Sequence, residues 1–348
     1  YDRNFDVVAD VDSRDPNYGN LTAGADAAEA VRNWGRQKVD LDLASLESRR
    51  PEKPMRGPLA QAPFLQGGKA PGKMLLTAVA RTASAPTRSR FPTSPIALNY
   101  PKSAADPHDV AVIIGNANYQ GHGRDIPDVV PAYADAEGFR QLALEGLGIR
   151  GDNIIFLRDA TQADMVATFG GETDHRGKLY NLVEPGKSKI FVFYSGHGAP
   201  GERGERYLVP VDAQGTTIRL NGYPLVTFYR NLGRLPARDI LVVLDACFSG
   251  VSPGGTVVPA ASGINLSAKQ NTVPRNITVF AAGAADQIAS WDKDKSHGLF
   301  TKYFLKGMSG EADAAPSGDG DGNIELGELK SYLKGTVTRL ARRYYGRN

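Results

Sequence analysis

The stretch KIFVFYSGHG, residues 189–198, carries the pattern that decides the fold. Residues 189–194 form a nearly continuous apolar run, which is typical of a strand covered by helices on both faces of a sheet. Segments with helical spacing lie at 131–148 and 224–235. Together they predict an α/β fold with a mostly parallel central sheet and helices on both faces. The remaining expected strands are 109–115, 153–157, 239–245 and 277–282.

Composition limits the class of protein. The chain has 348 residues, of which 41% are hydrophobic, and a net charge of +3. That charge is too small to indicate a nucleic-acid partner. No apolar run reaches the roughly 18 to 20 residues of a membrane span. The single cysteine excludes an internal disulfide, and the five histidines have no zinc-like spacing beside it.

The first 105 residues differ from the rest. Residues 48–105 contain nine prolines, ten Lys or Arg and one acid, Glu52. Such a stretch buries too little apolar surface to fold alone. We therefore expect residues 1–105 to be an N-terminal arm or pro-segment and the domain to span 106–348. Within the arm, GGKAPGK (67–73) imitates a phosphate loop, but Met74 replaces the Ser or Thr that would hold magnesium.

A histidine and the cysteine each follow a predicted strand. His197 leaves its strand through SGHG, and Cys247 leaves another through DACFSG. Carboxyl ends of parallel strands meet at one edge, so thiol and imidazole can cooperate in nucleophilic attack on an acyl carbon. Gly196 and Gly198 allow a tight turn, and the amides of Gly198 and Cys247 are candidates for an oxyanion hole. The alternative is a packed cysteine and an unrelated loop histidine.

The motifs YSGHG and DACFSG, with His197 and Cys247 50 residues apart, resemble the caspase-like cysteine proteases, nearest the metacaspase and bacterial orthocaspase branch. The resemblance covers about residues 108–345. It implies a caspase-like sheet, a large-subunit-like part at 106–250, a linker at 251–276 and a small-subunit-like part at 277–348. It also implies a cysteine endopeptidase that needs no cofactor and acts as a monomer.

The resemblance further implies a substrate pocket lined by acids. Asp245 lies two residues before the cysteine, where the family has a pocket acid, and Asp135 matches the second one. Asp286 and Trp291 match a wall of the cleft. Two carboxylates select a cationic side chain, and Arg fits them better than Lys. We therefore expect cleavage of protein or peptide substrates after Arg, then Lys. The alternative role for each acid is structural or solvated.

Arg specificity would make the chain's own linkers candidate substrates. The linker 251–276 carries Lys269 and Arg275, and the arm carries Arg81, Arg88 and Arg90. The arm then offers self-cleavage sites, occupies the acidic pocket as an inhibitor, or is a solvated tether.

A second interpretation of the whole chain is a catalytically silent caspase-fold scaffold, tuned by calcium. The compartment stays open between the cytoplasm and an exported or periplasmic location.

A loop near the C-terminus resembles an EF-hand. SGDGDGNIELGELKSYL begins at Ser317, and aligning Gly322 with the EF-hand glycine gives four ligand positions. Calcium is thus the metal candidate, although position one is normally Asp. The alternative is a polar turn that caps a helix from Glu325. The candidate ligands are Ser317, Asp319, Asp321 and Glu328.

Overall fold

The structure is a computed structural model. It describes residues 90–345 except 104, 124, 202–203, 250, 254, 258–272 and 283–289. The predicted helix at 25–34, the phosphate-loop imitation and most of the arm lie outside these residues. So do Arg81, Arg88, Lys269 and Asp286. None of the described helices is both long and apolar enough to cross a bilayer.

A five-stranded sheet with strand order β10-β7-β3-β1-β2 forms the centre of the domain, and every neighbouring pair is parallel. The predicted α/β fold with a mostly parallel sheet is therefore confirmed. All five expected strands exist, with ends displaced by one residue at most. They are β1 (Val110–Gly115), β2 (Ile154–Arg158), β3 (Lys189–Ser195), β7 (Asp239–Asp245) and β10 (Ile277–Ala281).

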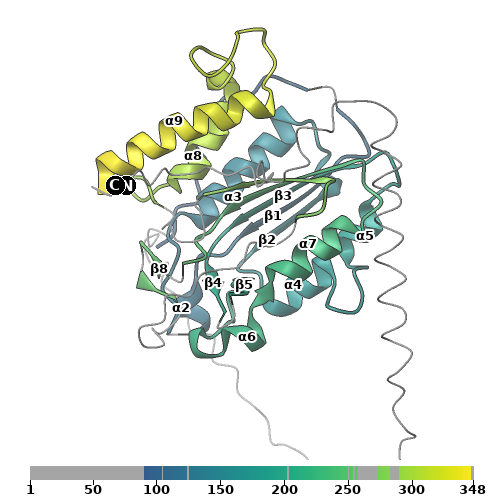
Figure 1. The fold of residues 1–348 in the computed structure, drawn as a ribbon, viewed down its shortest axis with the longest axis vertical. Coiled ribbons are helices and arrows are strands. Elements are labelled where there is room, and N and C mark those ends of the chain that lie inside the picture. The colour runs from purple at the N-terminus through teal and green to yellow at the C-terminus, as the bar shows by residue number, and fades with distance from the viewer. Residues whose placement is uncertain are drawn as a thin grey trace, which may run out of the picture. The chain divides into compact units, whose positions relative to one another are not determined.

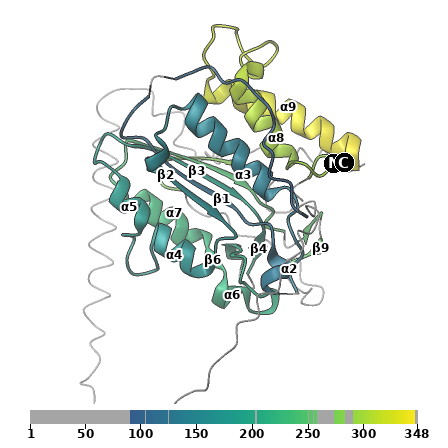
Figure 2. The ribbon, with the colours of Figure 1, turned by 180° about the vertical axis from the view of Figure 1, so that it is seen from behind.

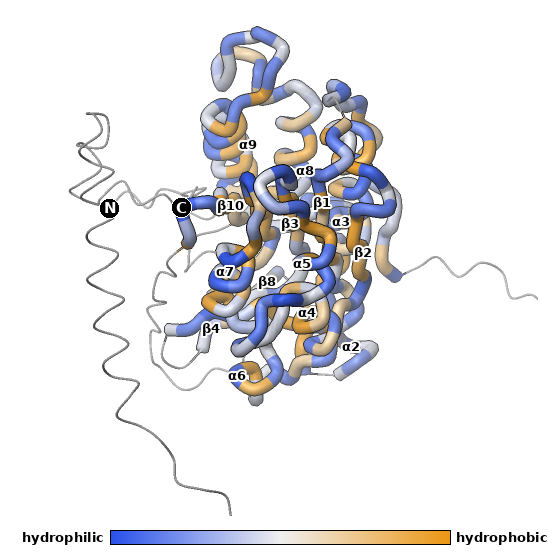
Figure 3. Tube along the Cα trace, turned by 90° about the vertical axis from the view of Figure 1, so that its right-hand side faces the viewer, coloured by the Kyte–Doolittle hydropathy of each residue, from blue (hydrophilic) through white to orange (hydrophobic). Residues whose placement is uncertain are grey.

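Helices cover both faces of this sheet (Figures 1 and 2). Alternate strand residues point to opposite faces, so Val112 and Val192 pack in one cluster while Ile113 and Phe193 pack in the other. Figure 3 shows apolar segments along β2 and β3 between these layers. One face carries α4 (Gln162–Phe169), α5 (Lys178–Leu182) and α7 (Leu225–Gly233); the other carries α3 (Ala132–Gln141), α8 (Leu299–Lys306) and α9 (Leu326–Tyr345).

Shorter elements complete the domain. The expected helix at 131–148 is split, because α3 continues into a π-helical turn, η2 (Leu142–Gly146). A small antiparallel sheet, which the sequence analysis did not anticipate, follows β3 and consists of β4 (Gly198–Pro200), β5 (Arg206–Leu208) and β6 (Tyr223–Pro224). The others are α2 (Tyr119–His122), η3 (Gly151–Asn153), η4 (Gly215–Thr217), α6 (Ile218–Asn221), β8 (Val251–Ser252), β9 (Gly255–Thr256) and η5 (Gly307–Glu311).

The end of the predicted arm packs on the domain. Phe91 and Tyr100 are buried in its apolar clusters, and Arg90 contacts Asp128 and Gln120. The described packing thus includes residues from Arg90 on, 16 residues before position 106, where we expected the domain to start. Neither partner of Arg90 lines the acidic pocket defined below. The expectation of an inhibitory arm stays a prediction.

Candidate active site

The candidate site lies where the strand order reverses. β1 connects outward to β2 on one side, whereas β3 and β7 lie on the other side, so the loops after β1 and β3 diverge. A crevice at such a switch point is the usual ligand site of an open α/β sheet. Gly115, Ser195 and Asp245 are in register across the ends of β1, β3 and β7. His197 and Cys247 each follow two residues later.

Both predicted dyad residues and both predicted pocket acids line one cavity, which we call the acidic pocket. Trp291, predicted as a wall, lines it too. The structure thus brings together five residues predicted from the sequence, whereas Asp286 lies outside the described residues. The complete lining is Val129, Pro131, Asp135, Ser195, Gly196, His197, Asp245, Cys247, Pro253, Trp291 and Gly298.

The imidazole of His197 is held in one orientation. It is buried, and its Nε2 lies 2.7 Å from the carbonyl oxygen of Pro127. A carbonyl can only accept, so Nε2 carries the proton and Nδ1 is left as an acceptor. Burial lowers the pKa of His197 to about 4, so the ring is neutral at neutral pH. A neutral ring with a free acceptor can take the proton of a thiol.

Two tyrosine hydroxyls hold the backbone of His197. Tyr119 accepts the His197 N–H at 3.0 Å, and Tyr194 donates to the His197 carbonyl at 2.8 Å. The Tyr119 ring also packs against the imidazole, with centroids 4.7 Å apart. Both hydroxyls bond the carbonyl of Val209. The histidine is therefore fixed by residues from α2, β3 and the segment after β5.

Gly198, predicted as part of the oxyanion hole, lies against the cysteine's backbone. A Cβ built there would come within 2.6 Å of the Cys247 carbonyl oxygen and 2.7 Å of the Phe248 ring. Only glycine permits this approach. Gly198 begins β4, in register with Leu208 of β5. Cys247 itself is buried, at 5% exposure.

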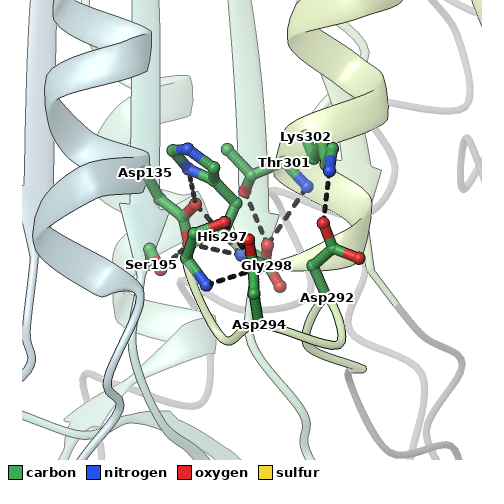
Figure 4. Close-up of polar contacts among 10 residues, drawn as sticks. Asp135, Ser195, Asp292, Asp294, His297, Gly298, Thr301 and Lys302 are labelled. Atoms are coloured by element: carbon green, nitrogen blue, oxygen red, sulfur yellow. Dashed lines mark hydrogen bonds and ion pairs between the residues drawn. The ribbon is translucent and has the colours of Figure 1, made fainter. Parts of the chain in front are cut away.

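The two acids of the acidic pocket are buried and carry different partners. Asp135, on α3, accepts from the Gly298 amide at 3.1 Å to each oxygen and from Ser195 Oγ at 3.2 Å (Figure 4). Asp245, at the end of β7, accepts from Thr301 Oγ1 at 2.5 Å and from its amide at 3.2 Å. Both Thr301 contacts fall on Oδ2 of Asp245, whereas each oxygen of Asp135 accepts from the protein.

Burial raises the pKa of both acids, and the charge of Asp135 adds to the shift of Asp245. Burial raises the pKa of Asp135, against the opposing effect of His297, whose Nδ1 lies 3.2 Å from Asp135 Oδ1. Burial, then the charge of Asp135, raises the pKa of Asp245 to about 7. Such perturbed carboxylates in a cavity are typical of a functional site. The pair is electrostatically complementary to a cation.

Several contributors to this site were missed in the sequence analysis. Ser195 lies inside the quoted motif and could have been found from its register with Asp245. His297 and Gly298 are adjacent in the sequence just before α8, and this His-Gly pair is the only signal that the sequence offers for them. Pro127 acts through a backbone carbonyl and Thr301 through contacts made only in the fold, so neither has a signal in composition or spacing.

The predicted calcium loop brings two of its expected ligands together with a third carboxylate. Carboxylate oxygens of Asp319 and Asp321 cluster with one from Asp313, all within 4.8 Å of one another. The Glu328 oxygens accept the amides of Asp319 and Glu325, which is the capping role given as the alternative. Asp313 is thus a candidate ligand that the sequence analysis did not name.

Comparisons with known proteins place the domain in a family. Residues 108–317, more than half of the chain, match the caspase domain. A search of curated proteins finds no match. A crystallised protein from Geobacter sulfurreducens is similar at 18% identity over 59% of this chain and 81% of its own, with a TM-score of 0.38, too low to carry an argument. On the match to residues 108–317, the chain belongs to the caspase domain family.

Proposed function

We propose that the protein is a cysteine endopeptidase of the metacaspase or bacterial orthocaspase branch that cleaves after Arg and, more slowly, after Lys. One observation carries the proposal: the imidazole of His197, the thiol of Cys247 and two buried carboxylates line the same cavity. This combination supplies a base, a nucleophile and a selective pocket within reach of one peptide.

In the proposed reaction, Cys247 Sγ attacks the carbonyl carbon before the scissile bond, and its proton passes to His197 Nδ1. The Gly198 and Cys247 amides stabilise the resulting oxyanion. His197 then gives the proton to the departing amine as the C–N bond breaks, which leaves a thioester. Water hydrolyses the thioester, with His197 again as base, and restores the thiol. The contact between Nε2 and Pro127 supports this assignment of Nδ1.

Arg specificity rests on the charges of the acidic pocket. Asp135 comes from α3 and Asp245 from the end of β7, and both line the cavity. A guanidinium presents five N–H groups in a plane and can bond two carboxylates at once. The Lys ammonium neutralises the same charge with less directional bonding, so we propose that it is the weaker substrate. An Asp side chain would meet repulsion.

The same specificity extends to self-processing in the basic linkers. Arg275 is exposed just before β10, and Arg90 is exposed where the described domain begins. We propose that a second copy of the enzyme cleaves such sites, because an acidic pocket accepts any accessible Arg. The Cys247→Ala protein should then stay intact during purification.

The test compares fluorogenic peptides ending in Arg, Lys or Asp. We expect the full chain to cleave Arg peptides fastest, and Cys247→Ala and His197→Ala to lose activity. Ser249→Ala, next to the nucleophile in sequence, serves as the control that keeps the dyad. Asp cleavage would overturn the pocket assignment. If none of the peptides is cleaved, also after removal of residues 1–89, the result would favour the alternative of a catalytically silent caspase-fold scaffold.

A further inference from the structure

We propose, in an inference that rests on the proposed function, that Arg90 is a positioning residue for the catalytic histidine. The guanidinium of Arg90 pairs with Asp128, and this contact fixes the loop whose Pro127 carbonyl holds the imidazole of His197. Arg90 precedes residue 108, where the match to the caspase domain begins. The role therefore belongs to a residue outside the matched domain.

The loop that carries Pro127 connects α2 to α3, and its described residues form no helix or strand. The carbonyl oxygen of Pro127 lies 2.7 Å from His197 Nε2. One planar peptide unit joins this carbonyl to the nitrogen of Asp128, so the position of Asp128 determines where the carbonyl points. The pyrrolidine ring already restricts the φ angle of Pro127. Holding Asp128 in place therefore holds the acceptor for His197.

Two groups hold the carboxylate of Asp128. Its Oδ1 accepts the amide of Gln120 at 2.9 Å, and its Oδ2 pairs with the Arg90 guanidinium. Nη2 of Arg90 also donates to Gln120 Oε1 at 2.7 Å, so the arginine joins both residues. The side chain of Asp128 is 5% exposed, whereas that of Arg90 is 60% exposed. Within the described parts of the chain, Arg90 is the one cation that forms an ion pair with Asp128.

Apolar packing brings the Arg90 segment to the same loop. Phe91 is buried in one cluster with Ile126 and Val129, the residues on either side of the Pro-Asp pair. The Arg90 guanidinium lies 5.4 Å from the centroid of the Phe91 ring. Trp291, which lines the acidic pocket, belongs to the same cluster. Because its segment is already packed beside the loop, Arg90 loses less conformational entropy when it forms the ion pair.

Loss of the guanidinium would leave the carboxylate of Asp128 without a cation. An ion pair between two exposed side chains contributes little, but a nearly buried charge without its partner is strongly unfavourable. The carboxylate then gains hydration by turning outward, and the Pro127 carbonyl moves with its backbone. A small displacement of a catalytic group lowers the reaction rate steeply. We therefore expect loss of Arg90 to lower kcat while KM changes little.

The first test measures cleavage of Arg peptides by the full chain. Arg90→Met keeps an unbranched side chain over Phe91 but removes the charge, and Arg90→Lys restores a cation. We expect kcat to fall about tenfold in Arg90→Met, with KM within about twofold, and to recover to within about threefold of the parent in Arg90→Lys. Asp128→Asn should lower kcat similarly. The double variant should lose no more than either single one, because both substitutions break the same contact.

A spectroscopic readout needs no turnover. In the Cys247→Ala full chain with isotope-labelled histidine, nuclear magnetic resonance reports which ring nitrogen of His197 carries the proton, and His197→Gln identifies its signals. Nε2 carries the proton in the structure, because the Pro127 carbonyl can only accept. We expect Arg90→Met to shift both nitrogen resonances toward a mixture of the two tautomers, and Arg90→Lys to restore them.

Two controls separate positioning from general anchoring. Arg150→Met removes an exposed guanidinium from Asp152, a pair that precedes β2 and so lies at the opposite end of the strands from the site. Its kcat and resonances should equal those of the parent. Tyr100→Leu loosens the segment of Arg90 in a different apolar cluster. It should lower the melting temperature and leave kcat and the His197 resonances unchanged. Circular dichroism establishes that each variant is folded.

The outcomes are distinguishable from failure of the proposed function. Unchanged kcat and unchanged His197 resonances in Arg90→Met would overturn the role of Arg90, and so would a fall in kcat with unmoved resonances. Equal changes in Arg90→Met and Tyr100→Leu would overturn it as well, because the segment would then act only through general anchoring. If the parent cleaves no peptide, the proposed function fails, and the resonances alone decide on Arg90.

Discussion

Ser195 on β3 and Asp245 on β7 are register partners at the carboxyl ends of neighbouring parallel strands. Because His197 and Cys247 each lie two residues further on, the sheet itself places these two residues at matching positions beyond its edge. The same register puts Ser195 beside the acidic pocket, where its hydroxyl donates to Asp135. Sheet pairing thus couples the dyad to the pocket.

Gly298→Ala should block the acidic pocket without disturbing the fold. A Cβ there would lie 2.2 Å from Asp245 Oδ2, although the backbone φ of −60° suits any residue. The cost is therefore steric and local. We expect Arg-peptide cleavage to fall at least about a hundredfold, which corresponds to about 2.7 kcal/mol.

The control for this variant is Gly335→Ala in α9, where nothing lies within 4 Å of an added Cβ. Alanine should favour the helix there by about 0.5–1 kcal/mol. Activity should not change. Full activity in Gly298→Ala would show that substrates do not enter between Asp135 and Asp245.

Asp245→Asn should stabilise the protein while it lowers activity. The folded pKa of Asp245, about 7, is above its unfolded value, so the folded state binds the extra proton between pH 4 and 7. Stability from this group is present in acid and is lost as the pH rises through 7. The amide avoids that loss, so the variant gains up to about 1.4 kcal/mol per pH unit across this window.

Differential scanning fluorimetry from pH 4 to 9 measures this trend. We expect the melting temperature of Asp245→Asn to exceed that of the parent most clearly above pH 7, where the difference becomes constant. Activity on Arg peptides should fall about 30-fold or more, which corresponds to about 2 kcal/mol of lost charge-assisted binding. Lower stability of the variant at pH 8 would contradict the raised pKa.

Tyr119→Phe should weaken catalysis by releasing His197. The variant leaves the buried His197 N–H without its acceptor, which costs about 1–3 kcal/mol of stability. A tilted imidazole transfers protons less well, so kcat should fall more than KM rises. Tyr223→Phe is the matched control, since its buried hydroxyl donates to the Gly170 carbonyl, outside the site. Equal kcat losses in the two variants would argue against positioning by Tyr119.

The calcium site predicted near the C-terminus stays a prediction, and the structure makes its test specific. Asp313 lies with Asp319 and Asp321. If the loop binds calcium, calorimetric titration should show binding that Asp313→Asn and Asp319→Asn abolish and Ser317→Ala retains. If titration with calcium gives the same heats in the presence and in the absence of a chelator, the site is excluded.

The fold was predictable because its signals are local. Five apolar runs with helical segments between them indicate strands that are buried on both faces, and each run forms a strand of the sheet. The same rule placed His197 and Cys247 at one edge. Asp135 and Asp245 came from family resemblance, and the cavity brings them together.

What the sequence could not supply depends on the backbone and on distant contacts. The carbonyl of Pro127 holds His197 from a loop 70 residues away, and any residue type has such a carbonyl. His297 reaches Asp135 across 162 positions. The small sheet of β4, β5 and β6 has strands of two or three residues, too short for periodicity to detect.

The hydrogen bonds from Gly298 to Asp135 and from Thr301 to Asp245 join residues on opposite sides of the segment 258–272. β7 and β10 pair across the same interval. Both pieces therefore contribute to the acidic pocket, with Trp291 and Gly298 coming from the second one. One polypeptide could end within that segment and a second, separately produced one could begin there. Their association would then form a split enzyme, and its activity would measure how far the two polypeptides have bound each other.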